Sequence, residues 1–208
     1  TGTQAFANII SGSGGETKLG AGTVTLSGAT SSYSGQTNIE QGTLSFSSSA
    51  NFGDASATNT IRIANNATLQ STGASVDLSA NRSISMAGNG ATIEVTSTNI
   101  LTAPGALIGD ECNTLTKTGT GTLVLTGGSN GTSFTGPTVV STGVLQVGAS
   151  GTGQTGSGSL TIASAGTVSG TGTVRAQSVT FAISSTLHAG DGTAVTNHGT
   201  LTFTPVVG

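Results

Sequence analysis

A short motif, Gly-Thr followed by an apolar or small residue, recurs along the chain. It begins at Gly22, Gly42, Gly121, Gly166, Gly172, Gly192 and Gly199, and looser versions begin at Ala67, Ala91 and Gly143. Steps of 20, 22 and 23 residues separate Gly22 from Gly42, Gly121 from Gly143, and Gly143 from Gly166. This length is typical of solenoids, in which each coil buries its apolar residues only against its neighbours. The spacing therefore predicts a stack of thin layers rather than one globular core.

The chain also repeats over a longer period of about 100 residues, which contains several of the short Gly-Thr repeats. The matching segments are 17–28 with 116–127 at an offset of 99, 33–46 with 134–147 at an offset of 101, and 60–69 with 159–168 at an offset of 99. The changes of offset fall in polar stretches such as 128–133, where loops tolerate changes of length. We therefore predict a single β-solenoid over residues 1–208, made of two related units at about 10–107 and 108–208.

The residues within each coil favour strands joined by tight turns. Runs such as Thr23–Leu26 and Thr122–Leu125 alternate, so the apolar members are expected to point inward and the threonines outward. The chain has 34 glycines, which suit the turns, and β-branched residues that interrupt every candidate helix. Only 6% of the residues are charged and mean hydropathy is +0.15, so apolar groups are available for burial and disorder is not expected.

Two ordered copies of a longer motif resemble the passenger-associated transport repeat of bacterial autotransporter proteins. The second copy reads LTKTGTGTLVLTG at 115–127, FTGPT at 134–138 and GVL at 143–145. The first copy reads TKLGAGTVTLSG at 17–28, YSGQT at 33–37 and GTL at 42–44, with Glu16 where the family usually has Leu. The matching residues are Lys18, Gly22, Thr23, Gly35, Thr37, Gly42 and Thr43, and Lys117, Gly121, Thr122, Gly136, Thr138 and Gly143.

This resemblance implies a fold and a location. The fold implied is a right-handed parallel β-helix, and the location is extracellular or at the bacterial cell surface. The resemblance does not imply one activity, because the same fold can carry many functions.

Charge and apolar content argue against two classes of partner. Net charge is −3, and the five basic residues are scattered along the chain. Binding to a nucleic-acid backbone requires a basic patch, so nucleic acid is not expected as a partner. No apolar run approaches the roughly 20 residues that span a bilayer, so this segment is not expected to insert in a membrane. Cys112 is alone, so disulfides do not define the fold.

The chain also lacks a convincing catalytic or metal-binding constellation, so we expect neither an enzyme nor a cofactor. Asp110 and Glu111 are the only adjacent acidic residues, and neighbours on a strand point to opposite faces. His188, Asp191 and His198 could in principle hold a metal, but convergence cannot be read from their spacing. A β-helix enzyme acting on polysaccharides remains the alternative from another class.

A threonine-rich solenoid could also bind ice or another ordered surface. That function requires Thr-x-Thr at one fixed place in nearly every coil. The pattern begins at Thr23, Thr120, Thr171 and Thr200, at irregular spacing. The irregularity favours an ordinary polar strand face.

These observations predict an extracellular structural or adhesive element. Loops such as 28–35, 47–59 and 128–137 would meet a partner, which could be a host or matrix surface or a glycan. Solenoid ends carry unpaired strand edges, so self-association into fibres is a second expectation.

Overall fold

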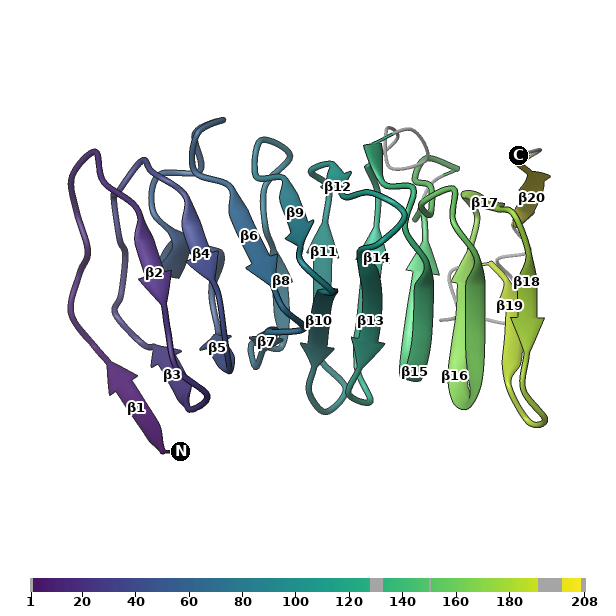
Figure 1. Ribbon diagram of the computed structural model, residues 1–208, viewed down its shortest axis with the longest axis horizontal. Helices are drawn as coiled ribbons and strands as arrows, with labels where there is room; N and C mark the ends of the chain where they lie inside the picture. Colours follow the sequence, from purple (N-terminus) through teal and green to yellow (C-terminus); the bar gives the residue numbers. More distant parts are fainter. Residues whose placement is uncertain (1, 128–132, 150, 191–199, 207–208) are drawn as a thin grey trace.

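The computed structural model describes residues 2–127, 133–149, 151–190 and 200–206. These residues form an elongated series of coils whose strands lie side by side along the long axis (Figure 1). The named strands pair in parallel, and one short 3-10 helix, η1 (Ser49–Phe52), lies between two of them. The predicted all-β fold is confirmed as a parallel β-solenoid of about 8 turns. No helix among the described residues is long and apolar enough to cross a membrane.

The strands form three stacks along the solenoid. The first stack contains β1 (Thr3–Phe6), β3 (Thr23–Leu26), β5 (Thr43–Phe46), β7 (Thr68–Ser71), β10 (Gly90–Val95), β13 (Thr114–Thr118), the first halves of β15 (Thr138–Val147) and β16 (Leu160–Gly170), and β18 (Val179–Phe181). The second contains β8 (Ser75–Asp77), β11 (Ile100–Ala103), β14 (Thr122–Leu125), the second halves of β15 and β16, and β19 (Thr186–Ala189).

The third stack contains β2 (Glu16–Lys18), β4 (Thr37–Ile39), β6 (Ile61–Ala64), β9 (Ile84–Ala87) and β12 (Leu107–Ile108). Near the C-terminal end, β17 (Thr173–Ala176) pairs with β20 (Thr202–Pro205). The chain thus passes from stack to stack, and each paired strand lies on a strand of the coil before it. The second stack begins only at β8, and the third ends at β12.

The register of the first stack gives the length of each coil. Successive partners are Thr3, Thr23, Thr43, Thr68, Thr92, Thr116, Val139, Thr161 and Thr180. The steps are 20, 20, 25, 24, 24, 23, 22 and 19 residues. The 20-residue step from Thr23 to Thr43 is the one that the Gly-Thr spacing predicts.

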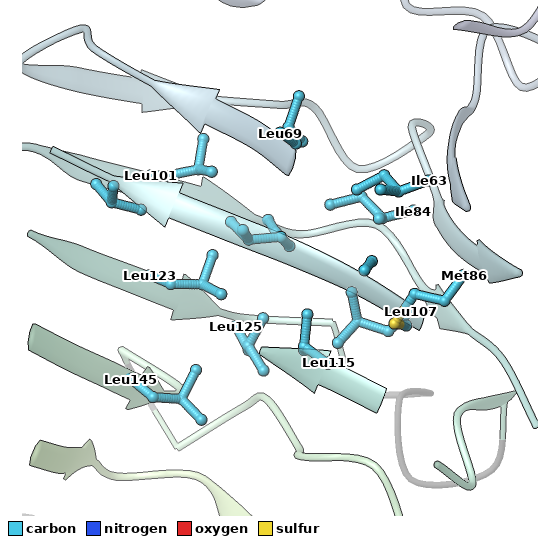
Figure 2. Packing of buried hydrophobic residues seen from close by; sticks show 14 of the residues in the cluster. Ile63, Leu69, Ile84, Met86, Leu101, Leu107, Leu115, Leu123, Leu125 and Leu145 are labelled. Carbon is cyan, nitrogen blue, oxygen red and sulfur yellow. The ribbon is translucent and has the colours of Figure 1, made fainter. Parts of the chain in front are cut away.

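Inward-facing side chains form columns that run through the coils. Leu44, Leu69 and Ile93 are register partners in the first stack, and all three are buried. Leucines from the second stack, including Leu101 and Leu123, belong to the same buried cluster as Leu69 (Figure 2). Because each coil contributes only a few such residues, its burial depends on the coils on either side.

The two sequence copies occupy different stacks. Four coil steps lead from Thr23 to Thr116 in the first stack, and Thr122 then lies in the second stack of that coil. The offset of 99 residues therefore equals four coils and one further stack. Strands β10 and β13 lie on either side of the predicted boundary at residues 107–108, and they pair directly with each other. The division into two units stays a sequence-based prediction.

We expect Leu69→Ala to lower the free energy of unfolding by about 2–5 kcal/mol, because it removes fully buried methyl groups from a layer that cannot collapse freely. Leu19→Ala is the control, since Leu19 is 70% exposed and its truncation should cost less than about 0.5 kcal/mol. Urea unfolding of both variants measures the difference. Equal effects would contradict the inward placement of Leu69.

Candidate functional site

The lysine of each sequence copy points into the solenoid rather than into solvent. Lys18 ends β2 in the third stack, where its register partner is the buried Ile39. Lys117 lies in β13 of the first stack, between Ile93 and Val140. Lys18 is 4% exposed and Lys117 is fully buried. Both lysines therefore occupy positions that aliphatic side chains fill in the neighbouring coils.

Each ammonium group donates to three backbone carbonyl oxygens, an arrangement that we call a lysine cradle. Lys18 Nζ lies 3.1 Å from Leu19 O, 2.6 Å from Gly20 O and 2.9 Å from Gln41 O. Lys117 Nζ lies 2.7 Å from Thr118 O, 2.9 Å from Gly119 O and 3.2 Å from Thr142 O. In each cradle, two carbonyls belong to the turn after the lysine and the third belongs to the next coil. The lysine therefore joins two successive coils at one corner.

Glycines allow the backbone to form each cradle. Gly20 and Gly119 have φ of +76° and +75°, in the left-handed region that glycine adopts without strain. In the next coil, Gly42 and Gly143 both have φ of +69°. A Cβ added at either position would collide with carbonyl oxygens of the preceding turn, such as Gly22 O below Gly42. The same close approach thus recurs in both copies.

Burial shapes the electrostatics of the cradles. In the part of the chain that the structure describes, the one salt bridge is between Arg62 and Glu40. Neither Lys18 nor Lys117 therefore has a carboxylate within ion-pair distance. Burial lowers the pKa of Lys117 to about 8, and the nearby Glu94 acts weakly in the opposite direction. Burial also lowers the pKa of Lys18. The carbonyl dipoles take the place of water as partners of the ammonium group.

The aromatic turn of the motif is buried in both copies. Tyr33 and Phe134 are almost fully enclosed, and the threonine four residues later is buried in each case. The Tyr33 hydroxyl lies 2.6 Å from Thr37 Oγ1 and donates to Glu16 Oε2 at 3.5 Å. Burial raises the pKa of Tyr33 to about 12.

The residue at which the first copy departs from the family pattern takes part in this contact. Glu16 with Tyr33 forms a polar pair in the first copy. The corresponding residues of the second copy are Leu115 and Phe134, which are both apolar and buried. The carboxylate and the hydroxyl thus occur together in the first copy, and burial raises the pKa of Glu16.

Arg82 forms a further buried cationic site, which the sequence analysis missed. It is 1% exposed, and its guanidinium donates to Asn59 Oδ1, Ser49 Oγ, and the carbonyl oxygens of Leu78 and Phe52 at 2.8–3.1 Å. The one feature of the sequence that could have indicated its burial is that no acidic residue lies within four positions of Arg82.

Two of the groups that accept hydrogen bonds from Arg82, Ser49 Oγ and Phe52 O, belong to loop 47–59. Asn51, Phe52 and Asn59 are buried, and Phe52 packs edge-to-face on Phe46. Part of this loop is therefore interior, while Ser47, Asp54, Ala57 and Thr58 are exposed.

The candidate catalytic and metal-binding residues do not gather in the part that the structure describes. Asp110 Oδ1 accepts a hydrogen bond from Cys112 N at 3.0 Å within a turn, and Glu111 is exposed. His188 is exposed on β19, while Asp191 and His198 lie outside the described residues. The described His, Cys, Asp and Glu side chains form no group of three that could hold a metal ion.

Comparison with known proteins adds one finding. The family model described as passenger-associated-transport-repeat matches residues 17–46 and 115–147. Both matched segments contain a complete lysine cradle and the buried aromatic residue. No curated protein and no solved structure matches the chain.

We expect Lys117→Met to lower the free energy of unfolding by about 1–3 kcal/mol at pH 7, because three carbonyl groups lose their donor. Arg62→Met is the control, since Arg62 lies partly in solvent and its loss should cost less than about 1 kcal/mol. Hydrogen exchange should show the added opening near residues 118–122 and 140–144. A loss no larger than that of Arg62→Met would contradict the role of the cradle.

The cost of Lys117→Met should also grow with pH. The pKa of Lys117 is about 8 in the folded chain and near its ordinary 10.5 in the unfolded chain, so the unfolded chain holds more protons between these values. Wild-type stability relative to Lys117→Met should therefore rise, by up to about 3 kcal/mol, from pH 8 to pH 10.5. Urea titrations at several pH values measure it. A difference that is flat or falls over this range would refute the lowered pKa.

Proposed function

Because the chain carries two passenger-associated transport repeats on a parallel β-solenoid, we propose that it is a rigid extracellular rod of an autotransporter-like surface or secreted protein. The observation that supports this most is the pair of lysine cradles, one in each repeat, within an unbroken series of parallel strands. The repeats imply secretion or surface exposure. The rod would act by length and display rather than by chemistry.

The dimensions suit a spacer. Eight coil steps at a strand spacing of about 4.8 Å give a rod of roughly 40 Å. Backbone pairing between coils supports stiffness along this length, and the cradles reinforce the corners. Polar segments at the bends, including 28–32 and 54–58, would then be presented to a host surface, a matrix or a glycan. Residues 128–132 of the third predicted loop lie outside the described residues.

The acidic residues support a structural role over a polysaccharide-acting enzyme. Glu40 pairs with Arg62, Glu94 accepts from Gln70, and Glu16 accepts from Tyr33. Asp54, Asp77 and Asp110 each accept a backbone N–H two residues later, at 2.8–3.0 Å. These contacts occupy six of the eight acids in local structure, whereas glycoside hydrolysis uses two facing carboxyl groups.

A second candidate function is end-to-end assembly into fibres. Phe6, Phe181 and Leu187 continue inward columns at the two ends of the described solenoid, and each is at least 40% exposed. Their register partners Leu26, Ile162 and Val168 are buried. A second copy, or a further coil of a longer protein, would cover these residues.

Surface display is tested by labelling intact cells of the bacterium that makes the protein. Antibody against the purified chain should bind cells that have not been permeabilised, and external protease should remove the signal. Labelling that requires permeabilisation would contradict an extracellular role.

Fibre formation is tested by electron microscopy and light scattering of the purified chain over a concentration series. Filaments that lengthen with concentration are expected, and Phe6→Ser with Leu187→Ser should abolish them by making both ends polar. Arg62→Ser is a control on the side of the rod and should leave them intact. Dispersed rods of wild type at every concentration would rule out assembly by this chain alone.

A further inference from the structure

One outward position of the first stack holds threonine in nearly every coil. The register aligns Thr3, Thr23, Thr43, Thr68, Thr92, Thr116, Thr161 and Thr180, with Val139 at the remaining position. We call this set the threonine column. The irregular spacing in the sequence hides it, because the coils differ in length.

The side chains of the threonine column are accessible and unpartnered. None of its nine residues is buried. No hydrogen bond in the described part of the chain uses a hydroxyl of these eight threonines. Threonines elsewhere differ, since Thr37, Thr72 and Thr120 all use their hydroxyls in contacts within the chain. The hydroxyls of the column are therefore available for an external partner.

The geometry of the column is regular and rigid. Parallel strands place successive members about 4.8 Å apart, and pairing on both sides fixes all but the end positions. Each threonine offers a hydroxyl that can donate and accept, beside a methyl group that orders the adjacent water. Val139 keeps the branched shape and a methyl group where it interrupts the hydroxyls. A fixed row of this kind matches a ligand whose own oxygen atoms repeat at a similar distance.

The neighbouring row limits the choice of ligand. Two residues along each strand, the register aligns Ala5, Thr25, Ser45, Gln70, Glu94 and Thr118. Glu94 is the one charge in this row, and it accepts from Gln70 at 2.9 Å. A second copy that overlapped fully through a two-fold axis would place Glu94 near its own equivalent, since Glu94 lies beside the fifth of the nine positions in the threonine column. That repulsion disfavours pairing of rods through this face.

The composition of the two rows also disfavours a polysaccharide. They contain no aromatic ring on which a sugar could stack, and the long polar side chains are limited to Gln70 and Glu94. Hydroxyl and methyl groups in a fixed lattice are suited instead to ordered water.

From these contacts we propose that the threonine column binds the surface of ice crystals. The proposal is independent of export and of fibre assembly, because it concerns the side of the rod. The hydroxyls would hydrogen-bond lattice water molecules, and the methyl groups would order the water between them. The low charge of the face limits the dehydration cost. Glu94 and Gln70 would weaken contact at the middle of the column.

The test measures partition of the purified chain into slowly growing ice, together with thermal hysteresis. Thr92→Arg places a bulky charge in the column, whereas Thr102→Arg places the same charge on β11 of the same coil, in the second stack. Both threonines are partly exposed. Wild type and Thr102→Arg should enter ice, and Thr92→Arg should fall to the level of an inert protein. Urea unfolding checks that both variants fold.

Val139→Thr and Glu94→Thr provide a gain-of-function test that does not depend on a disruptive change. Each should raise thermal hysteresis above wild type, because each makes the rows more uniform. Exclusion of wild type from ice would overturn the proposal, and so would equal losses in Thr92→Arg and Thr102→Arg. Binding to insoluble glucan or chitin that Thr92→Arg abolishes, without ice activity, would assign the column to a polysaccharide and also overturn it.

Discussion

Backbone hydrogen bonding between successive coils is the interaction on which this structure depends. A single coil of 19 to 25 residues buries too few side chains to be stable alone, and only stacking on its neighbours completes the inward columns. The coils must therefore stay in phase although their lengths differ. Extra residues in longer coils, such as η1, are accommodated at the bends, while the paired strands keep their positions.

Buried cations help to keep the corners in phase. Lys18, Arg82 and Lys117 are three of the five basic residues, and all three are buried and donate to backbone carbonyl oxygens. Each contacts more than one coil, so each ties a bend to its neighbour. With most of the charge used internally or in local pairs, the sides of the rod are nearly neutral. A nearly neutral, stiff and repetitive side is compatible with display, and Glu94 is the one charge in the row beside the threonine column.

Much of the fold could be predicted from the sequence, because glycines and alternating strands repeat at the coil length. The two repeats were also visible, and the family match confirms them. The burial of Lys117 was not predictable from one sequence, since lysine is seldom buried and its partners are carbonyl groups. Loop 47–59 was expected to face a partner, and that expectation stays a prediction. The burial of Asn51, Phe52 and Asn59 beside Arg82 was not foreseen. The threonine column was missed because it is periodic in coils and not in residues.

The coil register is the central claim, and disulfide trapping tests it most directly. In a Cys112→Ser background, Thr43→Cys with Thr68→Cys places two thiols on register partners, within the Cα separation of about 4.4–6.8 Å that a disulfide needs. Thr43→Cys with Thr92→Cys, two coils apart, is the matched control. The structure predicts rapid intramolecular crosslinking of the first pair and none of the second under mild oxidation. Crosslinking of both pairs alike, or of neither, would contradict the solenoid register.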